Sequence, residues 1–346
     1  MNRSNRREAT DEIVGLAFKR SLLYIAVAVV LFVAGLLVYK ALQKEEAFVE
    51  VPPASPVSTR VDVPFPAVNF TDITRTAGIS FSHSNGATGE KLLPETMGSG
   101  AAFFDYDNDG DQDLLLINSG HWSHEADPDE EQPTMKLYRN DGQGGFSDIT
   151  PVSGLDVPLY GMGVAVGDYD NDGDADVFIT ALGLNRLFRN DGGQFQDITT
   201  VAGVGGAEDA WSTSAGFADI DNDGDLDLFV ANYVRWSRQT DFDVNFQLTG
   251  IGRAYGPPTA FEGTYNYLYR NEGNDRFSDI SAGSGIQVDK SSTAKPMGKA
   301  LAVAPVDIDQ DGWMDLLVAN DTVPNFLFYN LGDGVFDERG AMLGVA

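Results

Sequence analysis

Four short stretches of this chain share one pattern, and each holds at least four aspartates within nine residues. They read DYDNDGDQD from Asp105, DYDNDGDAD from Asp168, DIDNDGDLD from Asp219 and DIDQDGWMD from Asp307. Aspartate stands at positions 1, 3, 5 and 9 and glycine at position 6, while position 7 is aspartate in three copies and Trp313 in the fourth. Carboxylates at this density repel one another, so a folded chain needs something that neutralises them.

Carboxylates at alternate positions of a tight loop can converge on one hard cation. Calcium takes six to eight oxygen ligands at about 2.3 to 2.6 Å, and glycine at position 6 permits the sharp turn. Position 7 accepts tryptophan as readily as aspartate, which favours a backbone carbonyl ligand there. We therefore predict about four Ca²⁺ ions, one per loop; Mg²⁺ and solvated loop acids without an ion are the alternatives. The predicted metal-binding residues are Asp105, Asp107, Asp109, Asp111, Asp113, Asp168, Asp170, Asp172, Asp174, Asp176, Asp219, Asp221, Asp223, Asp225, Asp227, Asp307, Asp309, Asp311, Trp313 and Asp315.

An EF-hand loop begins in the same way, but it supplies a bidentate glutamate at position 12 and lies between helices. Here position 12 is apolar in every copy: Leu116, Ile179, Val230 and Val318. The residues that follow position 9 form β-rich apolar runs such as DLLLIN and DLFVAN. These features exclude an EF-hand and predict a buried strand after each loop.

A second motif recurs between the acidic loops and predicts a β-hairpin. Its copies begin at Lys136, Arg186, Tyr267 and Phe326, as in KLYRNDGQGGFSDIT. Period-two alternation on either side of an Asn- and Gly-containing turn is typical of two antiparallel strands. Together with the strands that flank each acidic loop, one unit holds four short strands. We therefore predict an all-β chain, a β-propeller with four-stranded antiparallel blades.

The repeats are unevenly spaced because three long insertions separate them. These insertions cover Ser119 to Thr134, Arg235 to Thr264 and Gln287 to Pro296. Long irregular loops on a rigid body are where binding surfaces are usually built, so we expect function there. The aromatic residues of the largest insertion form either a platform for sugar or protein, or a cover for the blade edge.

One copy of the tail motif stands alone before the first acidic loop, in FTDITRTAGI from Phe70. Its front half is missing, as expected if an N-terminal strand closes the ring in the last blade. The chain stops at FDERGAMLGVA, where earlier copies run into a next blade. We therefore expect residues 67–346 to be a propeller that is incomplete at its C-terminus, in an N-terminal fragment of a longer protein. A small four-bladed ring closed by the tail is the alternative.

From Phe70 to Ala346 the chain resembles FG-GAP or VCBS repeat proteins, and among them the CRTAC1-like, ASPIC/UnbV-associated branch. The most specific segments are FSHSNGATGEKLLPETMGSGAAFFDYDNDGDQDLLLIN from Phe81 and GKALAVAPVDIDQDGWMDLLVANDTVPNFLFYNLGDGVF from Gly298. The calcium loops are similar to those of integrin α-chain propellers. This resemblance implies seven blades in the complete fold, of which about four are present here. It also implies a C-terminal ASPIC/UnbV domain, which does not follow in this sequence.

The N-terminus carries an apolar run, SLLYIAVAVVLFVAGLLVY, over residues 21–39. Its 19 residues lack a charge, which is about the length of a membrane-spanning helix. Because basic residues dominate 1–20, we expect that tail to be cytoplasmic. We accordingly predict a single-pass membrane protein with the propeller in the periplasm or outside the cell, rather than a cleaved signal peptide. Prolines in 40–66 predict an extended linker.

Charge and composition limit the classes of function that this chain can have. A formal charge of −29 argues against nucleic acid as a partner. With no cysteine, the chain has neither disulfides nor thiolate sites. His121 and His124 form only a weak candidate site for metal or acid–base chemistry. We predict a non-enzymatic, calcium-binding, membrane-anchored propeller that mediates adhesion to a protein or glycan. An exported polysaccharide-acting enzyme and a structural component of an envelope assembly are the alternatives.

Overall fold

A computed structural model describes residues 32, 34, 69–122 and 131–346. By its internal contacts the chain divides into two units, Met1–Phe70 and Thr71–Ala346. The predicted cytoplasmic tail, linker and nearly all of the apolar run lie outside the described residues. The second unit holds all of the strands that the structure describes.

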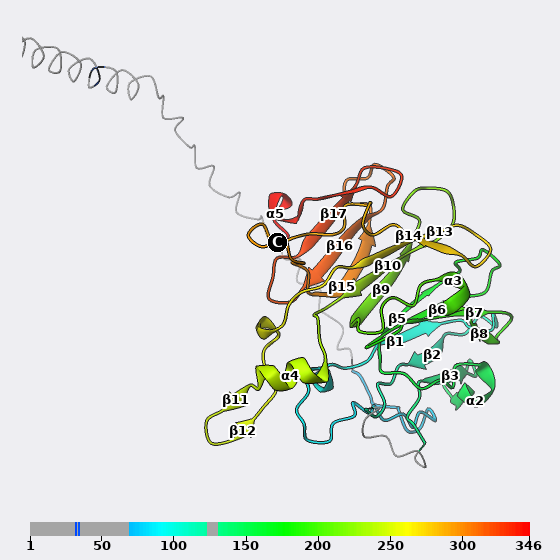
Figure 1. Cartoon of the computed structure of the whole chain (residues 1–346). Helices are drawn as coiled ribbons and strands as arrows, with labels where there is room; N and C mark the ends of the chain where they lie inside the picture. The colour runs from blue at the N-terminus through cyan, green and yellow to red at the C-terminus, as the bar shows by residue number, and fades with distance from the viewer. Residues whose placement is uncertain (1–31, 33, 35–68, 123–130) are drawn as a thin grey trace, which may run out of the picture. The chain divides into compact units, whose positions relative to one another are not determined.

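Four sheets of four antiparallel strands make up most of this unit (Figure 1). The first contains β1 (Ala101–Phe104), β2 (Asp113–Leu116), β3 (Lys136–Asn140) and β4 (Phe146–Asp148). The second contains β5 (Gly161–Gly167), β6 (Asp176–Ala181), β7 (Arg186–Asn190) and β8 (Phe195–Asp197). The third contains β9 (Ser212–Ala218), β10 (Asp227–Asn232), β13 (Tyr267–Asn271) and β14 (Phe277–Asp279). The fourth contains β15 (Ala300–Val306), β16 (Asp315–Asn320), β17 (Phe326–Asn330) and β18 (Phe336–Glu338).

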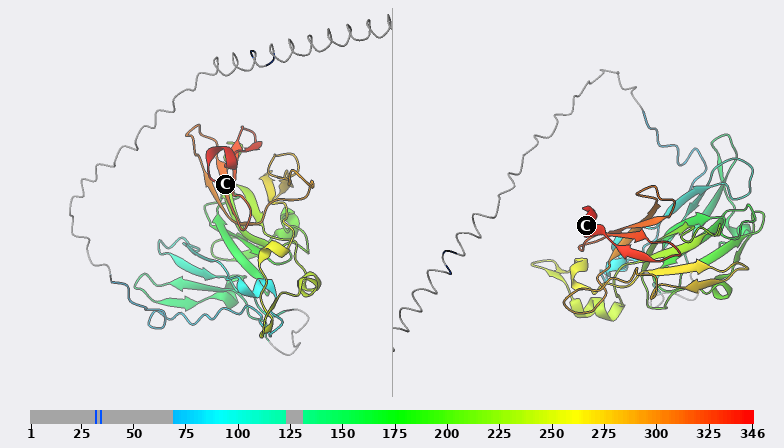
Figure 2. Two further views of the ribbon diagram at one scale, coloured as in Figure 1. Left: turned by 90° about the vertical axis from the view of Figure 1, so that its left-hand side faces the viewer. Right: turned by 90° about the horizontal axis from the view of Figure 1, so that it is seen from above.

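Each sheet follows chain order, with its neighbours paired as simple antiparallel ladders. The first strands of successive sheets contact one another, β1 with β5, β5 with β9 and β9 with β15. The sheets fan out from these strands, as Figure 2 shows. An all-β chain of four-stranded antiparallel sheets, consistent with propeller blades, is therefore confirmed. We refer to the sheets as blades 1 to 4.

The hydrophobic core lies between neighbouring blades. On β6, Val177 and Ile179 pack toward blade 1, whereas Phe178, on the opposite face, packs toward blade 3. Every residue of β6 and of β10 is buried. A strand covered on both faces needs apolar side chains on both, and this requirement explains the continuous apolar run after each acidic loop.

The two ends of the blades carry different segments, because antiparallel strands alternate in direction. The acidic loops join the first strand of a blade to its second, and the turns between third and fourth strands lie at the same end. The insertions leave from the opposite end, which we call the insertion face. There the chain forms η1 (Leu93–Thr96), α4 (Arg238–Val244), β11 (Gln247–Leu248), β12 (Gly252–Arg253) and η2 (Pro258–Ala260).

The isolated tail motif contacts blade 1 in the way the tail of blade 3 contacts blade 4. The backbone N–H of Phe146 donates to the carbonyl of Ala77 at 2.7 Å, and that of Phe336 donates to Ser284 at 2.7 Å. The short helices α2 (Thr150–Ser153), α3 (Thr199–Ala202) and α5 (Gly340–Leu343) follow the other blades at the corresponding position. The tail motif thus occupies the place of a blade tail that precedes blade 1.

The predicted membrane localisation is not supported. In the part of the chain that the structure describes, no helix is both long enough and apolar enough to span a bilayer. This finding contradicts the prediction of a single-pass membrane protein with a cytoplasmic N-terminus, and we do not retain it. The prediction was based on the uncharged apolar run over 21–39 and on the basic residues before it, nearly all of which lie outside the described residues.

Candidate metal centres

Each acidic loop folds around its first carboxylate. In the first loop, Asp105 accepts the backbone N–H of Asp109 on Oδ1 at 3.1 Å and that of Gly110 on Oδ2 at 2.9 Å. The same pair of bonds recurs in the loops that begin at Asp168, Asp219 and Asp307. The glycines at position 6 have φ between 92° and 96°. This left-handed conformation explains why glycine is required at position 6.

The carboxylate at position 9 joins its loop to the third strand of the same blade. Asp113 is fully buried. Its Oδ2 accepts the N–H of Tyr106 at 3.0 Å, and its Oδ1 accepts the N–H of Asn140 at 2.8 Å. Asp176, Asp227 and Asp315 make the equivalent bonds. Each oxygen retains a lone pair that can coordinate a cation.

In the first three loops the carboxylates at positions 1, 3 and 9 converge. One oxygen from each of the three lies within 4.8 Å of the others. The three sets are Asp105, Asp107 and Asp113; Asp168, Asp170 and Asp176; and Asp219, Asp221 and Asp227. Two oxygens that each lie about 2.4 Å from one calcium ion can be at most about 4.8 Å apart. The geometry therefore permits a single ion to bind all three carboxylates.

The position-3 carboxylates provide a second observation that fits a bound cation. Among the described residues, Oδ1 of Asp107, of Asp170 and of Asp221 is buried and has no hydrogen-bond partner. A buried hydrogen-bond acceptor without a partner destabilises the folded state. The same atom is unpartnered at the same loop position three times, and a bound cation would satisfy all three. The residues present thus fit a hard, oxygen-preferring ion.

Burial also shifts the proton equilibria at position 9. Desolvation raises the pKa of Asp176 to about 8 and that of Asp227 to about 7, and the neighbouring loop carboxylates add to both shifts. Burial raises the pKa of Asp113 as well. A nearby positive charge favours the ionised form of a carboxylate. A divalent cation in each loop would therefore keep these groups ionised at neutral pH.

The fourth loop differs from the other three. Its converging carboxylates are Asp307, Asp309 and Asp311, and two of these are exposed. The hydroxyl of Tyr329 donates to Asp309, whose counterparts in the other loops keep an unpartnered oxygen. The guanidinium of Arg339 lies 3.8 Å from the centroid of the Tyr329 ring. The position-3 carboxylate of the fourth loop thus has a hydrogen-bond partner within the protein.

Positions 4 and 7 connect the loops of successive blades. The side-chain amide of Asn108 donates to Asp174 Oδ1 at 2.7 Å, and that of Asn171 donates to Asp225 Oδ1 at 2.8 Å. Asn108 and Asn171 also donate to the carbonyl of the preceding glycine, and Asn222 keeps this contact with Gly312 at 3.1 Å, whereas Trp313 offers it no position-7 carboxylate. Sequence reasoning missed this series, which we call the loop ladder. The only signal was asparagine at position 4 of three copies.

A second asparagine connects the blades at the end of each third strand. Asn190 donates to the carbonyl of Tyr106 in blade 1 at 2.8 Å and to Ala175 in its own blade at 3.2 Å. Asn271 and Asn330 repeat this arrangement on blades 2 and 3. Each side chain satisfies two carbonyls, so the acidic loops of adjacent blades are held in a fixed register.

The histidines do not form a catalytic arrangement that the geometry supports. His83 Nε2 lies 2.9 Å from Ser99 Oγ and 3.2 Å from Ser119 Oγ, but both hydroxyls donate to the carbonyl of Gly161. The two hydroxyls also lie 3.0 Å from each other, so His83 is one member of a local hydrogen-bond cluster with these serines. His121 lines a pocket on the insertion face, and His124 lies outside the described residues.

Comparisons with known proteins agree with this architecture. A family model described as an FG-GAP-like repeat matches residues 105–179 and 178–230. Residues 105–230 therefore carry FG-GAP-like repeats. Among the similar proteins is cartilage acidic protein 1 of Xenopus tropicalis, 28% identical over 201 residues, which are 56% of this chain and 26% of that protein. The chain is thus similar to cartilage acidic protein 1 over about half of its length.

Two further relatives carry the same name. Cartilage acidic protein 1 of Mus musculus is 25% identical and that of Homo sapiens 26% identical, each over 203 residues and 56% of this chain. The match spans 26% and 25% of their lengths. A solved lectin of Agrocybe aegerita, described for recognition of non-reducing terminal N-acetylglucosamine, aligns over 73% of this chain and 66% of its own. Its TM-score is 0.30 at 17% identity, and we base no argument on it.

Proposed function

We propose that this chain is a calcium-binding, adhesion-type propeller that binds a protein or glycan and catalyses no reaction. The ions act structurally in this proposal: each joins the carboxylates of one loop, and the loop ladder passes that restraint to the next blade. Similarity to FG-GAP repeats and to cartilage acidic protein 1 supports an adhesion-type propeller.

The observation that carries the calcium assignment is the repeated unpartnered oxygen at position 3. Three loops place this atom within reach of two further carboxylates. Calcium is favoured over magnesium because the loop offers many protein oxygens, whereas magnesium retains several waters in a rigid octahedron. When bound, the ion would supply positive charge and fixed coordination. Asp105, Asp107, Asp113 and their counterparts would hold it.

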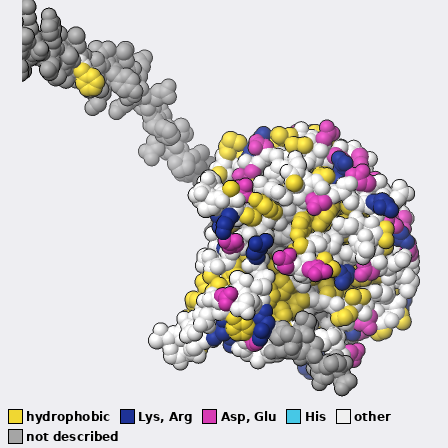
Figure 3. All heavy atoms as spheres, viewed as in Figure 1, with side chains coloured by type: hydrophobic (Ala, Val, Ile, Leu, Met, Phe, Trp, Pro, Cys, Tyr) yellow, Lys and Arg dark blue, Asp and Glu magenta, His cyan; other side chains and the backbone are white. Residues whose placement is uncertain are grey.

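The surface supports a binding role without nucleic acid. On the face that Figure 3 shows, Lys and Arg side chains are interspersed with Asp and Glu and form no continuous basic stripe among the described residues. The chain as a whole carries a formal charge of −29. Phosphate backbones would be repelled by such a surface.

Thermal unfolding in calcium and in chelator tests the proposal. A site filled at a hundred times its dissociation constant adds about 2.7 kcal/mol to the unfolding free energy. We therefore expect chelation to lower the melting temperature substantially. Asp170→Ala should reduce the shift by removing one site without unfolding the whole, and Gln194→Ala, outside the acidic loops, should leave it intact. Equal melting with calcium and with chelator would refute the calcium assignment.

Terbium luminescence can report on the fourth loop separately. Trp313 is the only tryptophan in an acidic loop, so excitation of tryptophan should sensitise terbium bound there. Trp313→Phe should abolish most of this signal and retain the calcium-dependent shift in melting temperature. If the unmodified chain and Trp313→Phe give the same luminescence, Trp313 sensitises no terbium, and the assignment of an ion to the fourth loop is contradicted.

A further inference from the structure

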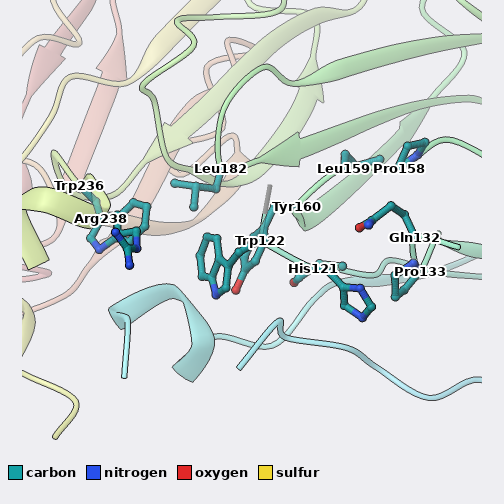
Figure 4. A pocket seen from close by; sticks show the side chains of 12 residues that line it. His121, Trp122, Gln132, Pro133, Pro158, Leu159, Tyr160, Leu182, Trp236 and Arg238 are labelled. Carbon is teal, nitrogen blue, oxygen red and sulfur yellow. The ribbon is translucent and has the colours of Figure 1, made fainter. Parts of the chain in front are cut away.

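The insertion face carries a pocket of about 600 Å³, shown in Figure 4. Segments from three blades meet there: the chain after β2, the chain before β5, the end of β6, and the start of α4. The residues that line it are Ser119, Gly120, His121, Trp122, Gln132, Pro133, Pro158, Leu159, Tyr160, Leu182, Trp236 and Arg238. It thus lies at the opposite end of the blades from the acidic loops.

Three aromatic rings form the floor of this pocket. Trp122 stacks on Tyr160 with ring centroids 4.4 Å apart, and on Trp236 with centroids 5.6 Å apart. In Figure 4, Trp122 and Tyr160 lie between the His121 end of the pocket and the Trp236 end. Leu182 lines the same space. Trp122 and Trp236 are 7% and 9% exposed, so this stack offers the pocket a small, rigid apolar surface from residues distant in sequence.

Two buried carboxylates hold these rings in place. Glu95, 4% exposed, accepts the indole N–H of Trp122 at 3.4 Å and the hydroxyl of Tyr255 at 2.8 Å. Asp241, 5% exposed, accepts the indole N–H of Trp236 at 2.7 Å and pairs with Arg253 at 2.8 Å. These two carboxylates thus fix the indole rings of Trp122 and Trp236 before a ligand binds. Binding would therefore cost little side-chain conformational entropy.

The polar groups of the pocket stand around this floor. His121 and Gln132 lie toward one end and Arg238 toward the other. Arg238 forms a bidentate pair with Glu90, so its charge is compensated within the protein. A ligand would therefore meet hydrogen-bonding groups and apolar carbon, without an uncompensated charge.

We propose that this pocket binds a neutral saccharide, a proposal that rests on the binding role assigned above and names its ligand class and site. Sugars combine apolar C–H faces with a rim of hydroxyls, which matches rings and aliphatic side chains bordered by an imidazole and an amide. The volume lies within the usual range for small-molecule sites, about 300 to 1,000 Å³. An anionic sugar would gain nothing from the paired Arg238 and would be repelled by the negative chain.

Binding of the full chain to an array of neutral and anionic oligosaccharides tests this inference. We expect retention of neutral glycans, with a change in tryptophan fluorescence on titration of the glycan retained most strongly. Gln132→Ala and His121→Ala should each raise the Kd about fivefold to tenfold, because one hydrogen bond contributes about 1 kcal/mol. Gln287→Ala makes the same truncation as Gln132→Ala on the insertion face but outside the pocket, and should leave the Kd unchanged.

Three outcomes would overturn the inference: no retention of any glycan, retention of anionic glycans alone, or equal affinity in the Gln132 and Gln287 variants. Each variant is also melted with calcium and with chelator. A retained calcium-dependent shift shows that the variant folds and that the acidic loops are intact. If the unmodified chain shows the calcium-dependent shift but binds no glycan, only the saccharide proposal is contradicted. If the unmodified chain shows no such shift, the proposed function is contradicted.

Discussion

The side-chain amide of Asn171 donates to Oδ1 of Asp225 across 2.8 Å, and it joins the acidic loop of blade 2 to that of blade 3. It also donates to the carbonyl of Gly224 at 3.3 Å. Asn108 makes the same two contacts one blade earlier. An acidic loop is therefore positioned by its neighbour as well as by its own backbone.

Asn171→Ala should weaken calcium binding by the third loop. Removing the donor frees Asp225 and loosens the loop, and one hydrogen bond contributes about 1 kcal/mol, or about fivefold in affinity. Calorimetric titration with calcium would measure this. Asn222→Ala should have the smaller effect, since Asn222 contacts a carbonyl of the fourth loop in place of a carboxylate. Comparable losses in both variants would show that the position-7 carboxylate has no part in the coupling.

Asn190→Ala should destabilise the fold more than Asn140→Ala. Asn190 is fully buried, and its truncation leaves the carbonyls of Tyr106 and Ala175 without their donor. We expect a loss of about 2 to 4 kcal/mol in unfolding free energy. The Asn140 amide donates to the carbonyl of Gln112 within its own blade, so about 1 kcal/mol is expected there. Urea unfolding of both variants in calcium checks the difference.

Gly154→Ala should be far more damaging than Gly203→Ala. Both glycines follow a blade tail with positive φ, 91° and 77°. A Cβ on Gly154 would lie 2.1 Å from the carbonyl oxygen of Phe195, whereas one on Gly203 would lie 3.9 Å from that of Phe277. Gly203→Ala should destabilise the fold only by the cost of placing alanine in the left-handed region, about 1 to 2 kcal/mol. Equal melting temperatures for the two variants would contradict close packing between blades 1 and 2.

Stability should depend on pH in the absence of calcium and become nearly independent of pH when calcium is saturating. Burial raises the pKa of Asp176 to about 8 and that of Asp227 to about 7, above the ordinary 3.8. At a pH between the ordinary pKa of 3.8 and these raised values, the folded chain without an ion holds more protons than the unfolded chain. Its stability therefore falls as pH rises. Calcium requires the ionised carboxylates, and its affinity should rise with pH over the same window.

Melting curves between about pH 5.5 and 7.5, in chelator and in calcium, would measure this difference. In chelator the melting temperature should increase toward the acidic end. In saturating calcium it should stay nearly constant, because the ion-bound folded chain and the unfolded chain both hold ionised carboxylates. Asp176→Asn removes the titrating carboxyl and should flatten the profile in chelator. If both conditions show the same slope in the unmodified chain, the position-9 carboxyls are not the groups that link protons to folding.

Local sequence predicted the elements well because local interactions set them. Glycine at position 6 is required by a φ between 92° and 96°, and the turn lies between two strands as expected. The apolar residue at position 12 falls in the second strand of every blade, so the exclusion of an EF-hand is confirmed. The predicted hairpins correspond to β3–β4, β7–β8, β13–β14 and β17–β18. The membrane prediction is wrong, since no helix in the described part of the chain is long and apolar enough to span a bilayer.

The spacing of motifs along the sequence could not predict the contacts between segments that are distant in sequence. Asn171 and Asp225 are 54 residues apart, and Asn190 and Tyr106 are 84 apart. These contacts exist because the blades pack with their loops in register, and no local pattern encodes that packing. The same holds for Trp122, Tyr160 and Trp236, which the sequence scatters over separate connections.

By itself, the sequence determined that this chain forms repeated β-blades with aspartate loops suited to a hard cation, since backbone turns and side-chain alternation depend on adjacent residues. The tertiary structure decided which oxygens converge, why the fourth loop differs through Tyr329, and where an aromatic pocket forms. Those features depend on side chains brought together by blade-to-blade packing, and that packing is a property of the whole fold.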